Sequence, residues 1–163
     1  MRLPLATLLI PLTLMAGPAL AADEPKDIAV AFCAARLRND EAATFKLLSA
    51  SLLKVITEAE ARNKTIADAQ PDEKPPFGDG IPYQSFQDQA SDCQVGDIAD
   101  VSGHKEVDVK YSIAGSPGAD WTDRLEIVAD PDGWRIDDIL FVEVANGVSD
   151  QGLRRVLFDA FDQ

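Results

Sequence analysis

Between residues 25 and 69 the apolar side chains recur every three or four positions, which is the spacing of one face of an α-helix. The pattern predicts three helices, with Asn39 and Asp40 ending the first and capping the second. Ser51 is expected to cap the third helix. The apolar positions of these helices are Ile28, Phe32, Leu37, Phe45, Leu47, Leu48, Leu52, Val55, Ile56 and Ala59.

From Cys93 onward apolar and polar residues alternate, which is typical of strands with one face in water. Strands are expected at 95–101, 107–113, 121–127 and 134–142, separated by turns rich in Gly, Pro and Asp. A closing helix carries Leu153, Val156, Leu157 and Phe161. This order predicts an α+β fold, in which N-terminal helices pack on a curved antiparallel sheet of about four strands and a C-terminal helix follows.

The segment 71–92 breaks both periodicities because it is rich in proline and glycine. It nevertheless contains four large apolar residues, Phe77, Ile81, Tyr83 and Phe86. A long loop of this kind is often functional. Two interpretations stay open: the four side chains form a candidate binding loop, or they cover the core as a lid.

The first 21 residues have the three parts of a secretory signal peptide: the cation Arg2, an apolar run and the cleavage motif Ala19-Leu20-Ala21. A membrane anchor is the alternative, but a spanning helix needs about 20 apolar residues. Breaks in this run lie at Pro11, Thr13, Gly17 and Pro18. We expect cleavage after Ala21, or after Ala22 as second choice, and a periplasmic domain over residues 22–163 with no stable membrane anchor.

The net charge of −13 becomes −14 once Arg2, the one charged residue of the segment 1–21, is removed. This charge argues against nucleic acid and anionic lipid as partners, because both would be repelled. A basic partner, such as an envelope protein, would be attracted. Solubility alone also accounts for an acidic surface.

Two cysteines, Cys33 and Cys93, remain after export, and an even count in an exported chain predicts one disulfide. The alternative is a pair of separately buried thiols. Zinc is not expected, because two cysteines and the only histidine, His104, cannot supply the usual four ligands. No metal and no cofactor is expected.

No motif for catalysis stands out, and no catalytic residue is assigned. A G-x-S-x-G elbow is absent from the sequence, and His104 is interpreted as an exposed turn residue. The acids Asp130, Asp132, Asp137 and Asp138 fail the calcium-loop pattern, because the twelfth position is Phe141. We interpret them as a turn with solvated acids, in which Asp137 and Asp138 point to opposite faces of a strand.

The chain has helices followed by strands and ends its strands with Pro131-Asp132-Gly133-Trp134-Arg135-Ile136-Asp137-Asp138-Ile139. In these features it resembles the nuclear-transport-factor-two-like superfamily of cone-shaped folds. Within that group it is similar to the exported proteins called domain of unknown function 3828, through the loop Gly78-Asp79-Gly80-Ile81-Pro82-Tyr83 and Phe86-Gln87-Asp88. The resemblance covers residues 27–142. It implies the fold more than the function, because this fold hosts enzymes, carriers and scaffolds.

Asp123 is the one polar residue on an otherwise apolar strand face, and we single it out as a candidate pocket group. Once inward, it must be hydrogen-bonded, paired with Arg124 or Arg135, or placed at a pocket mouth. Isomerases of this fold use an aspartate base with tyrosine or acid donors. The residues that could form such a set are Tyr83, Asp88, Tyr111 and Asp123.

Three functions remain. The first is a non-catalytic periplasmic binding or accessory domain that acts through the proline-rich loop and the concave sheet. The second is an acidic inhibitor or immunity-type protein for a basic envelope enzyme or toxin. The third is a small-molecule enzyme of the isomerase type, so a small-molecule ligand stays open.

Overall fold

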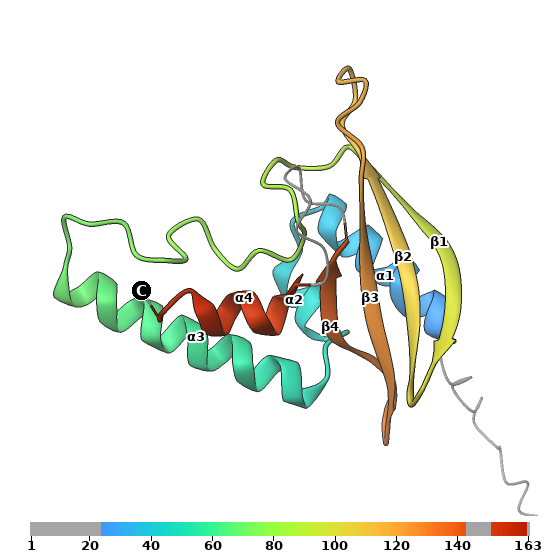
Figure 1. Ribbon diagram of the computed structural model, residues 1–163, viewed down its shortest axis with the longest axis horizontal. Coiled ribbons are helices and arrows are strands. Elements are labelled where there is room, and N and C mark those ends of the chain that lie inside the picture. The colour runs from blue at the N-terminus through green and yellow to red at the C-terminus, as the bar shows by residue number, and fades with distance from the viewer. Residues whose placement is uncertain (1–23, 143–150, 163) are drawn as a thin grey trace, which may run out of the picture.

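The computed structural model describes residues 24–142 and 151–162, so the expected signal peptide lies outside the described part of the chain. The fold is α+β, as predicted (Figure 1). The helices are α1 (Pro25–Leu37), α2 (Glu41–Phe45), α3 (Ala50–Ala69) and α4 (Leu153–Asp159). The strands are β1 (Asp92–Val101), β2 (His104–Ser112), β3 (Trp121–Asp130), β4 (Gly133–Phe141) and β5 (Gln151–Gly152).

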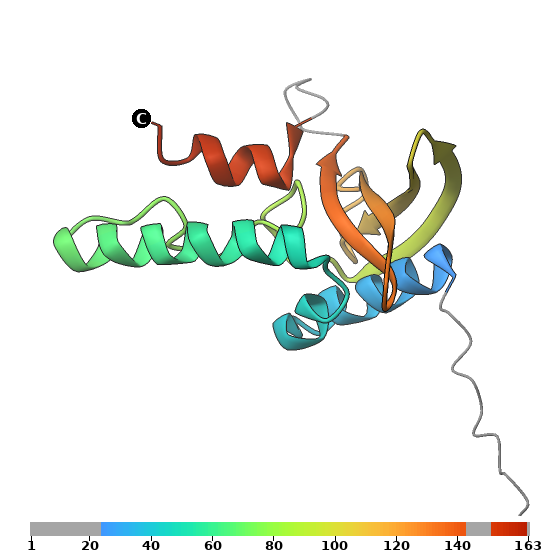
Figure 2. The same ribbon diagram turned by 90° about the horizontal axis from the view of Figure 1, so that it is seen from below.

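The sheet is an antiparallel meander with the strand order β1-β2-β3-β4-β5. The fifth strand is the one element that the pattern did not predict, because two residues are too short for an alternation. In β2 and β3 every second side chain is buried, and α1 lies against this inner face (Figure 2). Val107, Val109, Leu125 and Ile127 are fully buried there, so the inner face of the sheet is core rather than an open concave surface.

The break between α1 and α2 is the predicted one. Asn39 adopts a left-handed backbone conformation, with φ of 51°, which asparagine tolerates better than most residues. Asp40 then caps α2, because its Oδ1 accepts a hydrogen bond from the Ala43 amide at 2.9 Å.

Ser49, and not the expected Ser51, caps α3. Its Oγ accepts a hydrogen bond from the Leu52 amide at 3.0 Å and donates one to Asp137 Oδ1 at 2.5 Å. Its amide donates to the carbonyl of Ile136 at 2.8 Å. The prediction was wrong because both serines have the chemistry of a cap, and contacts with β4 select the first.

A disulfide joins Cys33 on α1 to Cys93 on β1, as predicted. It closes a loop with a sequence separation of 60, and both sulfurs lie where the helix crosses the edge of the sheet. In the chain-entropy account such a loop stabilises the fold by about 4 kcal/mol. No free cysteine remains in the described residues.

Two helices extend away from the sheet: α4 lies alongside α3, and the segment 71–92 returns over them (Figures 1 and 2). Arg154 fastens α4 to β4, because its Nη2 donates to Asp137 Oδ1 at 2.7 Å and its Nε to the Asp137 carbonyl at 2.8 Å. Within the described ranges, no helix has the length and apolar character to cross a membrane.

Candidate functional site: the acidic cleft beside the proline-rich loop

The second half of the proline-rich loop covers the core. Tyr83 is 3% exposed and Ala90 is 5% exposed. Phe86 is exposed at 38%, although its ring lies against that of Trp121 with 5.2 Å between centroids. The lid interpretation therefore describes the packing of Tyr83, whereas Phe86 covers the core only with one face of its ring.

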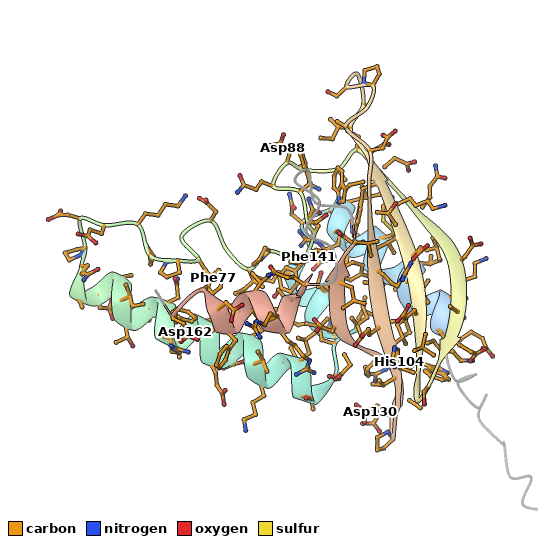
Figure 3. All side chains as sticks on the ribbon, viewed as in Figure 1. Phe77, Asp88, His104, Asp130, Phe141 and Asp162 are labelled. Atoms are coloured by element: carbon orange, nitrogen blue, oxygen red, sulfur yellow. A yellow bond between two sulfur atoms is a disulfide. The ribbon has the colours of Figure 1, made fainter. Side chains whose placement is uncertain are left out.

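The first half of the loop is anchored to α3 through Asn63. The Asn63 side chain accepts a hydrogen bond from the Phe77 amide at 2.8 Å, and its Nδ2 approaches the Phe77 carbonyl at 3.5 Å. The Phe77 ring meets Phe161, beyond the end of α4, edge-on at 5.4 Å. Phe77 therefore lies on the helical side of the molecule, far from the sheet end that carries His104 (Figure 3).

These contacts leave a cleft of about 290 Å³ between α2, α3 and the loop. We call it the acidic cleft, and its lining residues are Glu41, Glu60, Asn63, Lys64, Phe77, Gly80 and Ile81. Gly80 has φ of +95°, a conformation that favours glycine, so the turn that aims Ile81 at the cleft needs this residue. Phe77 and Ile81, two residues of the candidate binding loop, thus line the acidic cleft.

The two carboxylates of the acidic cleft are exposed, and the charge of Arg36 acts on Glu41 without forming an ion pair in the described residues. Neither Glu41 nor Glu60 forms an ion pair within residues 24–142 and 151–162. Lys64, the one cation of the lining, is bound to Asp68 at 2.8 Å. Partial burial raises the pKa of Glu60, and the charge of Glu41 raises it further. The cleft therefore holds negative charge beside apolar side chains.

The charges of the two carboxylates act on Tyr83, a buried residue of the loop. Burial raises the pKa of Tyr83 most, the charges of Glu41 and Glu60 raise it further, and Arg36 lowers it. The Arg36 guanidinium lies 5.1 Å from the centroid of the Tyr83 ring, and burial lowers the pKa of Arg36 itself. In the described part of the chain, neither the Tyr83 hydroxyl nor Arg36 Nε has a hydrogen-bond partner. The positive charge of Arg36 acts on both Glu41 and Tyr83.

Asp123 points inward and is fully buried. Its Oδ2 accepts a hydrogen bond from the Ser85 amide at 3.0 Å, so the loop itself caps the carboxylate. Arg124 is not its partner, because that side chain lies on the outer face and binds Asp108 at 2.7 Å. The neighbouring Tyr111 has its pKa raised by burial and then by the Asp123 charge.

Of the residues proposed for isomerase chemistry, the structure brings Tyr111 and Asp123 together. Asp88 is an exposed loop residue and does not join them (Figure 3). Asp123 lines neither the acidic cleft nor a second hollow of about 420 Å³ at the end of the first three strands. The lining of that second hollow is Asp92, Gln94, Lys110, Tyr111, Ser112, Asp120, Trp121 and Thr122.

The aspartates of β4 are not all solvated, contrary to the expectation from the sequence. Asp132 is exposed in the turn before Gly133, but Asp137 and Asp138 both bind Arg154 instead of facing water separately. Asp138 Oδ1 accepts hydrogen bonds from the Ile139 and Arg154 amides at 2.8 and 3.1 Å. A register shift beside Glu126 inserts an extra residue in β4, which breaks the simple alternation.

The position of His104 also differs from the exposed turn expected from the sequence. The histidine is the first residue of β2 and pairs with Val101, so it belongs to the sheet and not to an exposed turn. Its side chain is 22% exposed and faces Glu106 and Glu126 on the outer face.

No protein-family model, curated protein or solved structure gives a significant match to this chain. Sequence reasoning missed four residues of the acidic cleft, Glu41, Glu60, Asn63 and Lys64. They lie on the polar faces of two helices, where charged residues ordinarily need no special role. No local signal distinguishes them, because the loop that turns this surface into a cleft follows later in the chain.

Proposed function

We propose that this chain is an exported, non-catalytic binding domain of the periplasm, and that its acidic cleft receives a basic side chain of an envelope protein. The observation that carries the proposal is that Glu41 and Glu60, which form no ion pair in the described residues, line one cleft with the apolar side chains of Phe77 and Ile81. Lysine and arginine have the matching form, since each has an apolar stem and a charged head.

The cleft of about 290 Å³ is lined by acidic and apolar side chains together, which suits the charged head and apolar stem of one basic side chain. The net charge of −13 adds long-range attraction for a basic surface. A partner held in this way binds with an affinity that falls as salt rises.

The other two functions make different demands. An acidic inhibitor or immunity-type protein shares the charge and predicts a tight complex spread over much of the surface. An isomerase needs its base exposed to substrate, whereas Asp123 is buried beneath Ser85. The cleft therefore favours the binding domain.

We also infer the cellular location of the chain and its family. Residues 1–21 act as a signal peptide, the mature chain begins at Ala22, and the chain is a member of the nuclear-transport-factor-two-like superfamily, in domain of unknown function 3828. An α+β order with an antiparallel meander and a disulfide between Cys33 and Cys93 supports both inferences. Mass spectrometry of the chain from a periplasmic extract tests the first, and an N-terminus at Met1 would contradict it.

The function is tested by photocrosslinking in cells from a benzophenone amino acid at position 81. The partner captured there is then purified, and its affinity for the chain is measured at low and high salt. The variant E41Q/E60Q removes the two cleft charges. The matched control D72N/E73Q removes two charges from exposed loop residues that form no ion pair within the described residues. We expect salt-sensitive binding that E41Q/E60Q weakens at least tenfold and that D72N/E73Q leaves unchanged. If both variants weaken the affinity for the partner equally, the result would favour the inhibitor. If neither variant changes the affinity, the acidic cleft is not the binding site.

A further inference from the structure

The chain's only histidine lies between two glutamates on the outer face of the sheet. Glu106 on β2 and Glu126 on β3 are direct cross-strand partners, so their side chains leave the same face side by side. His104 precedes Glu106 by two residues and therefore shares that face. His104 lies on the sheet, away from Phe77 on the helical side of the molecule (Figure 3).

The three groups already have nearly the spacing of metal ligands. One ligand atom from each of His104, Glu106 and Glu126 lies within 4.8 Å of the other two. His104 Nε2 is 3.4 Å from Glu106 Oε1 and 3.9 Å from Glu126 Oε1. Two ligands of a tetrahedral zinc ion, each about 2.1 Å from it, are about 3.4 Å apart. The distance from His104 to Glu106 thus fits as it stands, and the distance from His104 to Glu126 needs a small side-chain rotation. The two carboxylate oxygens, which lie within 4.8 Å of each other, are brought together by the same rotation.

A neighbouring cation holds one glutamate in place without using the oxygen that faces the histidine. Arg124 Nη1 donates to Glu106 Oε2 at 3.2 Å, and Arg124 Nε donates to Asp108 Oδ1 at 2.7 Å. Glu106 Oε1 therefore stays directed at His104. Contacts of this kind orient ligands in metal sites.

The second glutamate has no such neighbour. Among the described residues, His104 is the one group that can carry a positive charge within 4.0 Å of the Glu126 carboxylate. Its Nε2 is 3.9 Å from Glu126 Oε1, and this distance is too long for a hydrogen bond. Glu126 also stands opposite Glu106 on one side and Asp138 on the other. Like charges directly opposite each other destabilise a sheet, and a bound cation would remove that cost.

We propose that His104, Glu106 and Glu126 bind one divalent transition-metal ion, with zinc as the best fit. An imidazole nitrogen distinguishes the set from a purely acidic patch, which suits calcium or magnesium. A histidine with two carboxylates supplies three zinc ligands and leaves a fourth position for water or an external ligand. The side chains are 22%, 17% and 29% exposed, so the ion is reachable from solvent. The proposal is independent of the acidic cleft.

The test is zinc titration by calorimetry of the chain purified from the periplasm, with any affinity tag removed. We expect one equivalent of zinc to bind, H104Q and E126Q each to weaken binding at least about tenfold, and E73Q to leave it unchanged. Calcium is expected to bind more weakly than zinc. Thermal unfolding of each metal-free variant checks that the fold is retained, so that the loss belongs to the site.

Absence of zinc binding by the wild-type chain would overturn the proposal. So would zinc affinity that is the same in H104Q and the wild type, because binding would then belong to the acidic surface in general. Several equivalents of zinc with no effect of E126Q would lead to the same conclusion.

Discussion

Gly152 can be replaced to test how the C-terminal helix is fastened to the sheet. Its backbone is extended, with φ of −79° and ψ of 159°, so the conformation alone permits any residue. A Cβ at this position, however, would lie 2.2 Å from Asp138 Oδ2 and 2.8 Å from Asp138 Cγ. In G152A the carboxylate therefore has to move by about 1 Å to reach ordinary van der Waals contact.

That movement strains the two hydrogen bonds that Asp138 Oδ1 accepts from the Ile139 and Arg154 amides. A hydrogen bond to a charged group contributes about 1.5–3 kcal/mol. Because the carboxylate can shift without losing both bonds entirely, we expect G152A to lower the free energy of unfolding by about 3 kcal/mol. For a domain of this size the melting temperature then falls by about 10 °C.

A double-mutant cycle separates this contact from other effects of the substitution. Urea unfolding, followed by tryptophan fluorescence, is measured for the wild type, G152A, D138A and D138A/G152A. In the D138A background the clash is gone, so G152A should retain only the cost of alanine at the N-cap, about 1 kcal/mol or less. Any cost of alanine at a helix N-cap is common to both backgrounds and cancels. If G152A is equally destabilising in both backgrounds, the contact with Asp138 is not the cause.

Two further predictions concern the disulfide and pH. Replacing Cys33 and Cys93 by alanine should lower the free energy of unfolding by about 4 kcal/mol in urea, and stoichiometric thiol labelling of the denatured, unreduced wild type would contradict the bond itself. Burial raises the pKa of Asp138, although the two amides that donate to it lower it. The folded state therefore holds this proton more tightly than the unfolded state, so the wild type should gain stability relative to D138N as pH falls from 7 toward 4. Parallel pH profiles of the two proteins in urea unfolding would refute that assignment.

Much of the fold could be predicted because the hydrophobic pattern is strong where one face is wet. The alternation at Val107, Val109 and Tyr111 predicts β2 and its buried face, and the inward position of Asp123 follows from the same rule. The cap of α3 could not be predicted. Ser49 and Ser51 have equal local chemistry, and Asp137, which is 88 residues away from Ser49, decides between them.

The candidate sites were less predictable because they depend on register and on loop placement. His104 follows a glycine and has the local sequence of a turn, yet strand pairing brings it beside Glu126, 22 positions later in the chain. Glu41 and Glu60 come from separate helices and line one cleft only because Phe77, Gly80 and Ile81 of the proline-rich loop complete it. Contacts between residues that are far apart in the chain do not produce a periodic pattern in the sequence.

Binding of a basic side chain in the acidic cleft can be observed by NMR titration of the chain. N-acetyl-lysine amide and its norleucine analogue, which has the stem without the charge, are titrated into the isotope-labelled chain. The lysine analogue should shift the amide resonances of residues 77–81. The variant E41Q/E60Q should abolish these shifts, and D72N/E73Q should leave them unchanged. Equal shifts with norleucine, or shifts that persist in E41Q/E60Q, would contradict binding of a basic side chain in the acidic cleft.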